Sequence, residues 1–258
     1  MHRYFLPFSA LLLAFAINCS EKSHEEYFNI GFKARTEQDF AKAKKNYLKA
    51  LKIKKTAELY KELGNVYLFG EHDLDKAEEH YRLSLNVDPN YMNALHNMGV
   101  ISLERYANSI NKKGKGKERF LEEAEQWFFK AKIAAPNFDL TYTNLGKLYF
   151  YKKTYKKALK YFNQAIELNA DNPLPYTGLG EVFLQQKKYD QALMNLEKAY
   201  DISTNVPETA LLLSRVYKKK HDRPKARHYY SVYLKLLKQQ KREKEYKKAR
   251  KERKELNL

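Results

Sequence analysis

A period of about 34 residues is the feature that most limits what this chain can fold into. Six alanines recur along the sequence, each four positions before a large apolar or aromatic residue. They are Ala43, Ala77, Ala124, Ala158, Ala192 and Ala226, and the step between neighbours is constant except from Ala77 to Ala124, where it is longer. A repeat of this length indicates a solenoid, in which each repeat packs on its neighbours, rather than a domain with one central core.

Each alanine is preceded by a second pattern, built around a small residue. In most copies a large apolar residue lies four positions before it, another lies immediately before it, and an aromatic residue follows three positions later. The small residues are Gly31, Gly64, Gly99, Gly146, Gly180 and, in a degenerate last copy, Ser214. On a helix these apolar residues share one stripe, and glycine lets a second helix pack closely there. Each repeat is therefore expected to be a pair of antiparallel helices.

The two patterns together resemble the tetratricopeptide repeat, W-x₂-L-G-x₂-Y followed by A-x₃-F. The cleanest copy reads Tyr142, Leu145, Gly146, Tyr149, Ala158, Phe162 and Ala165. The resemblance covers about residues 24–237 and implies an all-α, right-handed α-solenoid of about six helix-turn-helix repeats. The expected repeats are 24–56, 57–91, 92–138, 139–172, 173–206 and 207–237.

Composition agrees with a helical solenoid. The 258 residues include only nine Gly and seven Pro, so turns are few, and 43% are hydrophobic, which is enough to build a core. Most of the 21 Tyr and 14 Phe are interpreted as core residues. Four prolines fall at repeat junctions, at Pro89, Pro136, Pro173 and Pro207. Three second helices have predicted N-caps, at Asp39, Asp73 and Asp222.

Two segments depart from the repeat. The third repeat carries 13 additional residues within about 104–117, interpreted as a basic loop joining two lengthened helices. This loop lacks G-x-x-x-x-G-K-[ST], so we do not expect a nucleotide site. The segment 238–258 has ten Lys+Arg and four Glu, and it is predicted to be a basic helix that extends the last helix and frays.

The start of the chain is typical of an export signal. A basic Met1–Arg3 precedes the apolar run Phe5–Ile17, which as a helix would span about 20 Å, less than the roughly 30 Å of a bilayer core. The only cysteine, Cys19, follows in the box Ala16-Ile17-Asn18-Cys19. This resembles the bacterial lipoprotein signal, although Asn18 stands where Gly or Ala is usual.

That resemblance implies a signal peptide at residues 1–18, a lipid on the Cys19 thiol and a short tether at 19–23. The mature chain would be exported and lipid-anchored to a bacterial membrane, at the periplasmic face or the cell surface. It would keep a formal charge of +17 of the original +18, because only Arg3 is lost. An ordinary cleaved signal with a coincidental cysteine, or an uncleaved start, are the alternatives.

The residues that usually perform catalysis are not grouped. The seven His are scattered, and neither H-E-x-x-H nor G-x-S-x-G occurs. A single cysteine also excludes disulfides within the chain and Cys-rich zinc sites. We expect no enzyme activity, no cofactor and no metal.

Tetratricopeptide solenoids bind peptides or helices in a groove lined by the first helix of each repeat, and some grip a C-terminal carboxylate. Three positions of that clamp carry over to Lys61, Asn65 and Asn97, but the other two fall on the non-basic Leu140 and Asn144. A weaker expectation is a groove that offers donors to an acidic or carbonyl-rich segment. Its predicted lining is Lys61, Asn65, His96, Asn97, Asn144, Lys147 and Arg215. The alternative is that these residues are merely solvated.

Two functions follow. The first is a membrane-anchored scaffold of the bacterial envelope that binds a protein or peptide partner and assists assembly of a complex. Repeat number and size resemble the pilotin lipoproteins and the tetratricopeptide lipoprotein of the β-barrel assembly machinery. The second is binding of an anionic membrane surface or cell-wall polymer by the basic tail. The tail residues concerned are Lys241, Arg242, Lys247, Lys248, Arg250, Lys251, Arg253 and Lys254. Nucleic acid is not expected, because lysines are spread over all repeats of an exported chain.

Overall fold

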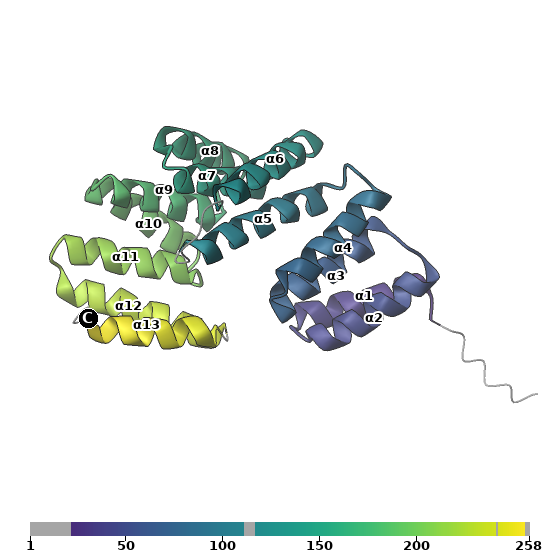
Figure 1. Cartoon of the computed structure of the whole chain (residues 1–258). Coiled ribbons are helices and arrows are strands. Elements are labelled where there is room, and N and C mark those ends of the chain that lie inside the picture. The colour runs from purple at the N-terminus through teal and green to yellow at the C-terminus, as the bar shows by residue number, and fades with distance from the viewer. Residues whose placement is uncertain (1–21, 111–116, 241, 256–258) are drawn as a thin grey trace, which may run out of the picture.

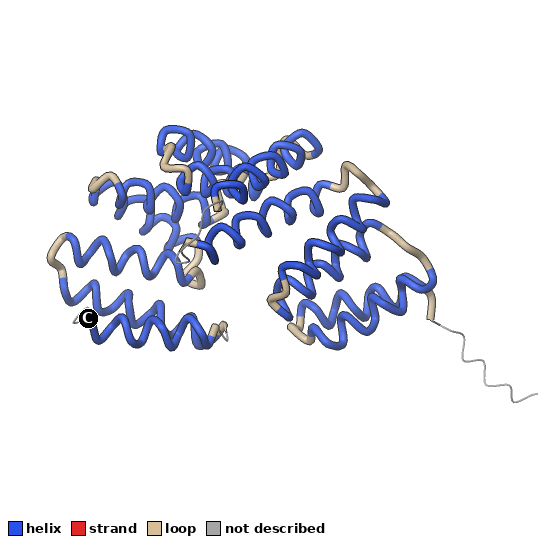
Figure 2. Tube along the Cα trace, viewed as in Figure 1, coloured by secondary structure: helices blue, strands red, loops and turns tan. Residues whose placement is uncertain are grey.

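The computed structural model describes residues 22–110, 117–240 and 242–255 (Figure 1). The signal segment, Cys19, Lys241 and most of the loop in repeat three lie outside these ranges. The described residues form thirteen α-helices and one π-helical turn, with no strand among them (Figure 2). The all-α solenoid predicted from the repeats is therefore confirmed.

The helices form six antiparallel pairs and one final helix. In Figure 1 the pairs follow one another around an arch, from the purple α1 and α2 to the yellow α13. The first helices are α1 (His24–Thr36), α3 (Ala57–Asn65) with its continuation η1 (Val66–Glu71), α5 (Met92–Ser109), α7 (Asp139–Tyr151), α9 (Pro173–Gln185) and α11 (Pro207–Lys219). The second helices are α2 (Phe40–Ile53), α4 (Leu74–Val87), α6 (Glu118–Ala134), α8 (Tyr155–Leu168), α10 (Tyr189–Ile202) and α12 (Arg223–Gln239). The final helix is α13 (Glu243–Glu255).

Glycine and an aromatic ring set the distance between the helices of a pair. A Cβ atom at Gly146 of α7 would lie 2.5 Å from the ring of Phe162 on α8, and a Cβ at Gly178 of α9 would overlap the same ring. One ring is thus held between two consecutive repeats. In the last pair Ser214 replaces the glycine, and its hydroxyl donates to the Ala226 carbonyl oxygen at 2.7 Å. That bond explains why a polar residue is tolerated at a fully buried position.

The turns inside the pairs also repeat. The predicted N-caps are confirmed, because the carboxylates of Asp39, Asp73 and Asp222 each accept from the backbone N–H three residues later, at 3.0 Å. One residue before each of these aspartates the backbone turns through positive φ, at Gln38, His72 and His221. The pair in repeat three is longer: α5 and α6 have 18 and 17 residues, against 13 and 14 for α7 and α8.

The π-helical turn η1 occurs where repeat two has one residue too many. The interval from glycine to alanine runs from Gly31 to Ala43 in repeat one, whereas in repeat two it runs from Gly64 to Ala77 and is one residue longer. A π turn widens the helix by one residue. The additional residue is therefore absorbed inside the first helix, which ends at Glu71 and is followed by His72 in the left-handed region.

The basic tail is helical, but the prediction that it extends the last helix is wrong. The helix α12 ends at Gln239, and α13 packs back against it. The hydroxyl of Tyr230 donates to the Ala249 carbonyl oxygen at 3.0 Å, and Ala249 is 1% exposed. A straight extension would leave Ala249, Tyr246 and the apolar end of α12 in water, so burial of apolar surface favours the folded-back helix.

The packing of Phe162 yields a stability prediction. Alanine is favoured over glycine in a helix by about 1 kcal/mol, whereas overfilling a packed core destabilises by about 1–3 kcal/mol. We expect Gly146→Ala and Gly178→Ala each to lower the free energy of unfolding, measured by urea denaturation. Combining either change with Phe162→Leu should lessen the loss, because the smaller side chain leaves room for the new methyl. A higher free energy of unfolding in either single variant would contradict the close contact of the Phe162 ring with that glycine.

Candidate functional site

Every residue predicted to line the groove lies on a first helix. Contacts between α5 and α7, between α7 and α9, and between α9 and α11 make these helices neighbours in space. The structure divides the predicted residues into two groups. Those on α3 and α5, together with Asn144 on α7, are bonded to other side chains of the chain. Lys147 on α7 and Arg215 on α11 belong to a second group, which we call open because its side chains make no hydrogen bond or close ion pair with the described residues.

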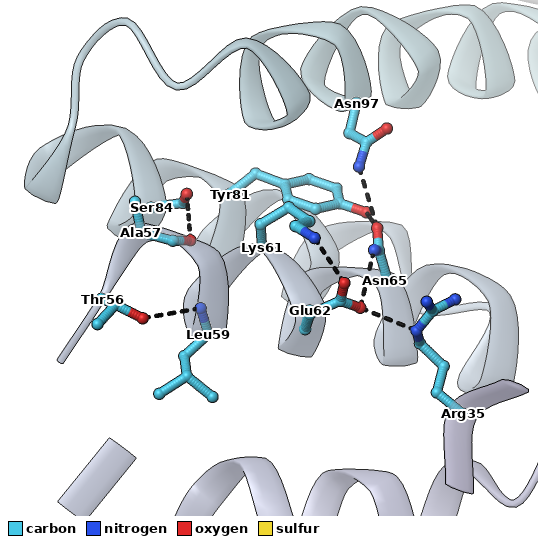
Figure 3. A network of polar contacts seen from close by, with 10 residues as sticks. All are labelled: Arg35, Thr56, Ala57, Leu59, Lys61, Glu62, Asn65, Tyr81, Ser84 and Asn97. Carbon is cyan, nitrogen blue, oxygen red and sulfur yellow. Dashed lines mark hydrogen bonds and ion pairs between the residues drawn. The ribbon is translucent and has the colours of Figure 1, made fainter. Parts of the chain in front are cut away.

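The first group surrounds a buried carboxylate, that of Glu62, which is 3% exposed. Lys61 Nζ lies 2.5 Å from Glu62 Oε1, and Arg35 Nε lies 2.9 Å from Glu62 Oε2 (Figure 3). Asn65 Nδ2 donates to the same Oε2 at 3.2 Å. The charge of Lys61 is therefore neutralised inside the protein, and the lysine itself is 8% exposed. We call this set, with Tyr81 and Asn97, the Glu62 network.

The carbonyl oxygen of the Asn65 side chain joins three helices. It accepts from the Tyr81 hydroxyl at 2.7 Å and from Asn97 Nδ2 at 3.0 Å (Figure 3). Burial raises the pKa of Tyr81 far above its usual value, so this hydroxyl remains a donor. The three residues that matched a carboxylate clamp are thus brought together, but an incoming carboxylate would meet Glu62. The arrangement ties α3, α4 and α5 together.

His96 also makes contacts within the chain. Its Nε2 lies 3.3 Å from Asn144 Nδ2 and its Nδ1 lies 3.1 Å from the Thr141 hydroxyl. Because the amide can only donate to Nε2, the proton of the neutral ring is assigned to Nδ1. The rings of Phe128 and Phe138 lie 5.7 and 5.2 Å away. Burial lowers the pKa of His96 to about 4, against a small opposing effect of Asp139, so the ring is neutral at pH 7.

The open group is a row of three charges, which we call the charged row. Lys147, Glu181 and Arg215 lie on α7, α9 and α11, each one repeat period after the one before, so they share one register. Lys147 and Arg215 are exposed and Glu181 is partly buried. Within the described ranges none of the three makes a hydrogen bond or a close ion pair. Burial raises the pKa of the Glu181 carboxyl, and the two cations act in the opposite direction.

Glu181 is absent from the predicted site residues, although the sequence holds a signal for it. The repeat period that relates Lys147 to the next repeat leads to Glu181, and a further period leads to Arg215. Aromatic surface borders the row, because the ring of Tyr151 lies 5.9 Å from Lys147 Nζ and 5.3 Å from the ring of Tyr106. The row thus combines charge with apolar surface.

The predicted anionic-surface residues divide in the same way. Arg242 pairs with Glu208 at 2.8 Å and with Glu245 at 2.6 Å, so it fastens α13 to α11. Arg250 lies over the ring of Tyr246, 5.8 Å from its centre, and Arg253 is only partly exposed. Lys247, Lys248 and Lys251 are exposed on α13. Lys241 and the side chain of Lys254 lie outside the described structure.

Comparisons with known proteins identify the repeat. A family model described as TPR repeat matches residues 146–187, and one described as tetratricopeptide repeat matches residues 175–205. The photosystem I assembly protein Ycf3 of Prochlorococcus marinus is 31% identical over 119 residues, 45% of this chain and 65% of that protein. The Ycf3 of Acaryochloris marina is 33% identical over 110 residues, 40% of this chain and 60% of that protein. The matched region thus spans less than two thirds of these relatives.

Solved structures share the fold. PilF of Pseudomonas aeruginosa has a TM-score of 0.63 at 23% identity, covering 89% of this chain and 97% of that one. PilW, a type IV pilus biogenesis factor, has a TM-score of 0.64 at 17% identity, covering 81% and 90%. A thermophilic TPR protein in Thermus thermophilus has a TM-score of 0.63 at 18% identity, covering 82% and 100%. This chain is a solenoid protein that contains tetratricopeptide repeats.

Two further features are absent from the described ranges. No helix there combines the length and apolarity needed to cross a bilayer. Nor does that part of the chain place three or more His, Cys, Asp or Glu side chains where they would hold a metal ion.

The depressed pKa of His96 makes stability depend on pH. The folded ring binds a proton only near pH 4, whereas an unfolded histidine does so near 6.5. Stability from the neutral ring is therefore complete above about pH 6.5 and is lost as the pH falls towards 4, by about 1.4 kcal/mol per unit. We expect His96→Gln to lessen the loss of unfolding free energy between pH 7 and pH 5 by about 2 kcal/mol.

The matched control is His228→Gln, which removes an exposed histidine on α12. Urea denaturation at the two pH values measures the difference. An equal pH dependence in wild type and His96→Gln, or a loss of pH dependence in His228→Gln, would show that His96 is not buried as a neutral ring.

Proposed function

We propose that this chain is a membrane-attached scaffold that binds a partner segment across the first helices of repeats four to six. The charged row carries the proposal, since Lys147, Glu181 and Arg215 have no hydrogen-bond or close ion-pair partner among the described residues. The tetratricopeptide repeat suits protein–protein interaction, and its families are generally not enzymes. The sequence predicts an acidic or carbonyl-rich ligand. Because Glu181 lies between the two cations, we now propose a ligand that carries charges of both signs.

Glu181 is the centre of the proposed binding site. A partly buried carboxylate without a hydrogen bond is unfavourable, and a cation from a partner would relieve it. Lys147 and Arg215, on either side, would then hold carboxylates. Neighbouring helices pack about 8–10 Å apart and an extended segment advances about 3.3 Å per residue. The complementary segment is therefore acidic, basic and acidic at intervals of about three residues.

An assembly role is the biological interpretation that we favour. Ycf3 is named as an assembly protein and PilW as a biogenesis factor. Both are similar to this chain, and a scaffold that holds one chain while a complex forms would suit the open row. We infer that the partner belongs to an envelope complex, because the start of the chain resembles a bacterial lipoprotein signal.

The second candidate function is binding of an anionic surface by the tail. It is favoured by Lys247, Lys248 and Lys251, which lie exposed on α13. Under this alternative the charged row is solvated and the repeats act as a spacer.

A peptide test distinguishes the two functions. We expect a labelled peptide Asp-Ala-Ala-Lys-Ala-Ala-Asp to bind at least about tenfold more tightly than its charge-reversed counterpart, because each charge-assisted bond contributes about 1.5–3 kcal/mol. The triple variant Lys147→Glu, Glu181→Lys, Arg215→Glu should reverse this preference in fluorescence anisotropy. Glu167→Gln, an exposed change on α8, is the control and should keep it. If wild type and triple variant each bind both peptides equally well, the charged row is not the binding site.

Membrane attachment is tested at Cys19, which lies outside the described residues. In a bacterial host, Cys19→Ala should abolish palmitate labelling and move the protein from the membrane to the soluble fraction. The control is Ser20→Ala, which should leave both unchanged. Labelling that persists without the cysteine would reject the lipid anchor.

A further inference from the structure

The outer face of α2 combines positive charge with exposed apolar side chains. Its inner face packs through Ala43, Tyr47 and Ala50, all fully buried. The opposite face exposes lysines together with two large apolar side chains, Leu48 at 42% and Ile53 at 55% exposure. The helix carries five lysines and no acidic residue, and Lys54 and Lys55 follow it. We call the exposed residues the α2 patch, which consists of Lys42, Lys45, Leu48, Lys52, Ile53 and Lys55.

This combination sets α2 apart from the other second helices. Helix α12 also lacks acidic residues, but it exposes no large apolar side chain. The remaining second helices, α4, α6, α8 and α10, all carry carboxylates among their basic residues. Within the described ranges, α2 is therefore the helix that presents apolar side chains on an entirely positive face.

The lysines of the α2 patch keep their charge uncompensated. Lys44, on the flank of the helix, pairs with Glu71 at 2.8 Å, and Lys49 lies over the ring of Tyr27. By contrast, Lys42, Lys45, Lys52 and Lys55 make no ion pair or cation–π contact with the described part of the chain. Lysines in other repeats have carboxylate partners, as Lys152 has Glu125 and Lys220 has Asp190. The α2 patch is thus a positive surface that the solenoid itself leaves unpaired.

The α2 patch also lies where the N-terminal segment joins the folded body. Helices α1 and α2 are antiparallel, and Lys49 Nζ is 5.1 Å from the centre of the Tyr27 ring, so the last turns of α2 lie against the first turn of α1. Helix α1 begins at His24. The lysines at 52–55 are therefore close to the point where residues 1–21, with their apolar run Phe5–Ile17, are attached.

We propose that the α2 patch binds a bilayer surface that contains anionic lipid headgroups. The inference rests on the membrane attachment in the proposed function, and it names the face of the protein that meets the membrane. Lysines within a Debye length of an anionic surface, about 8–10 Å, each strengthen binding about fivefold. Leu48 and Ile53 enter the headgroup boundary, as aliphatic side chains of interfacial helices do. The outer face of the first repeat then lies on the membrane.

The test uses the full chain with Cys19→Ala, so that no acyl chain contributes, and flotation with two kinds of vesicle. Vesicles with phosphatidylglycerol should bind more protein than vesicles of phosphatidylcholine alone. Changing Lys45, Lys52 and Lys55 to Gln should lower the preference for phosphatidylglycerol vesicles at least about tenfold. The control changes Lys247, Lys248 and Lys251 to Gln on α13, with the same loss of charge, and should lower it less than about twofold.

Three outcomes would overturn the proposal. The first is undiminished phosphatidylglycerol-dependent binding by the α2 variant. The second is an equal loss in the α13 control, which would mean that net charge or the tail is responsible. The third is an α2 variant that loses binding to poly-glutamate but not to the vesicles, which would make the patch a site for acidic protein.

Peptide binding by the same α2 variant separates this inference from the groove. It should equal that of wild type, because α2 is remote in sequence from α7, α9 and α11. If the peptides fail to bind and the vesicle result holds, the scaffold function is wrong and the lipid surface stands. If palmitate labelling fails and the vesicle result holds, the anchor alone is wrong. Unchanged melting of the α2 variant confirms that it is folded.

Discussion

The close approach of two helices at a glycine is the contact on which this solenoid depends. Phe162 fills the space that Cβ atoms at Gly146 and Gly178 would need, so one ring sets the distance within a pair and to the next pair. Because other pairs use the same kind of contact, with Tyr47 against Gly31 for example, successive first helices come to lie side by side. The charged row lies across α7, α9 and α11, which the packing makes neighbours. The position of these three charges relative to one another therefore depends on the contacts between the first and second helices.

Polar groups on the first helices serve two different purposes along the arch. In repeats one to four they hold the array together: Glu62 is surrounded by Arg35, Lys61 and Asn65, and His96 bridges α5 and α7. Removing one member would leave a buried charge or donor unpaired, which is strongly destabilising. On α7, α9 and α11, by contrast, Lys147, Glu181 and Arg215 make no hydrogen bond or close ion pair with the described residues. The same repeat thus carries internally bonded polar side chains at one end of the array and charged side chains without close partners at the other.

The sequence predicts the helix pairs and three caps well, because apolar periodicity and Asp39, Asp73 and Asp222 act locally. It does not predict the return of α13, since burial of Ala249 depends on a surface formed by α12. The sequence also does not predict that Lys61 is buried in an ion pair with Glu62. The two residues are adjacent in the chain, and only the fold brings their side chains together. Glu181 is different, because the repeat period alone is sufficient to find it.

The π turn η1 has a consequence for the repeat period. The interval from Ala43 to Gly64 is one residue shorter than the interval from Ala158 to Gly180, and the extra residue in η1 follows within the same repeat. The two changes offset one another, so the step from Ala43 to Ala77 is 34 residues, as it is from Ala124 to Ala158. A π turn accommodates one additional residue in a helix. The turn η1 thus lets the chain keep its repeat period although the two intervals within it have unequal lengths.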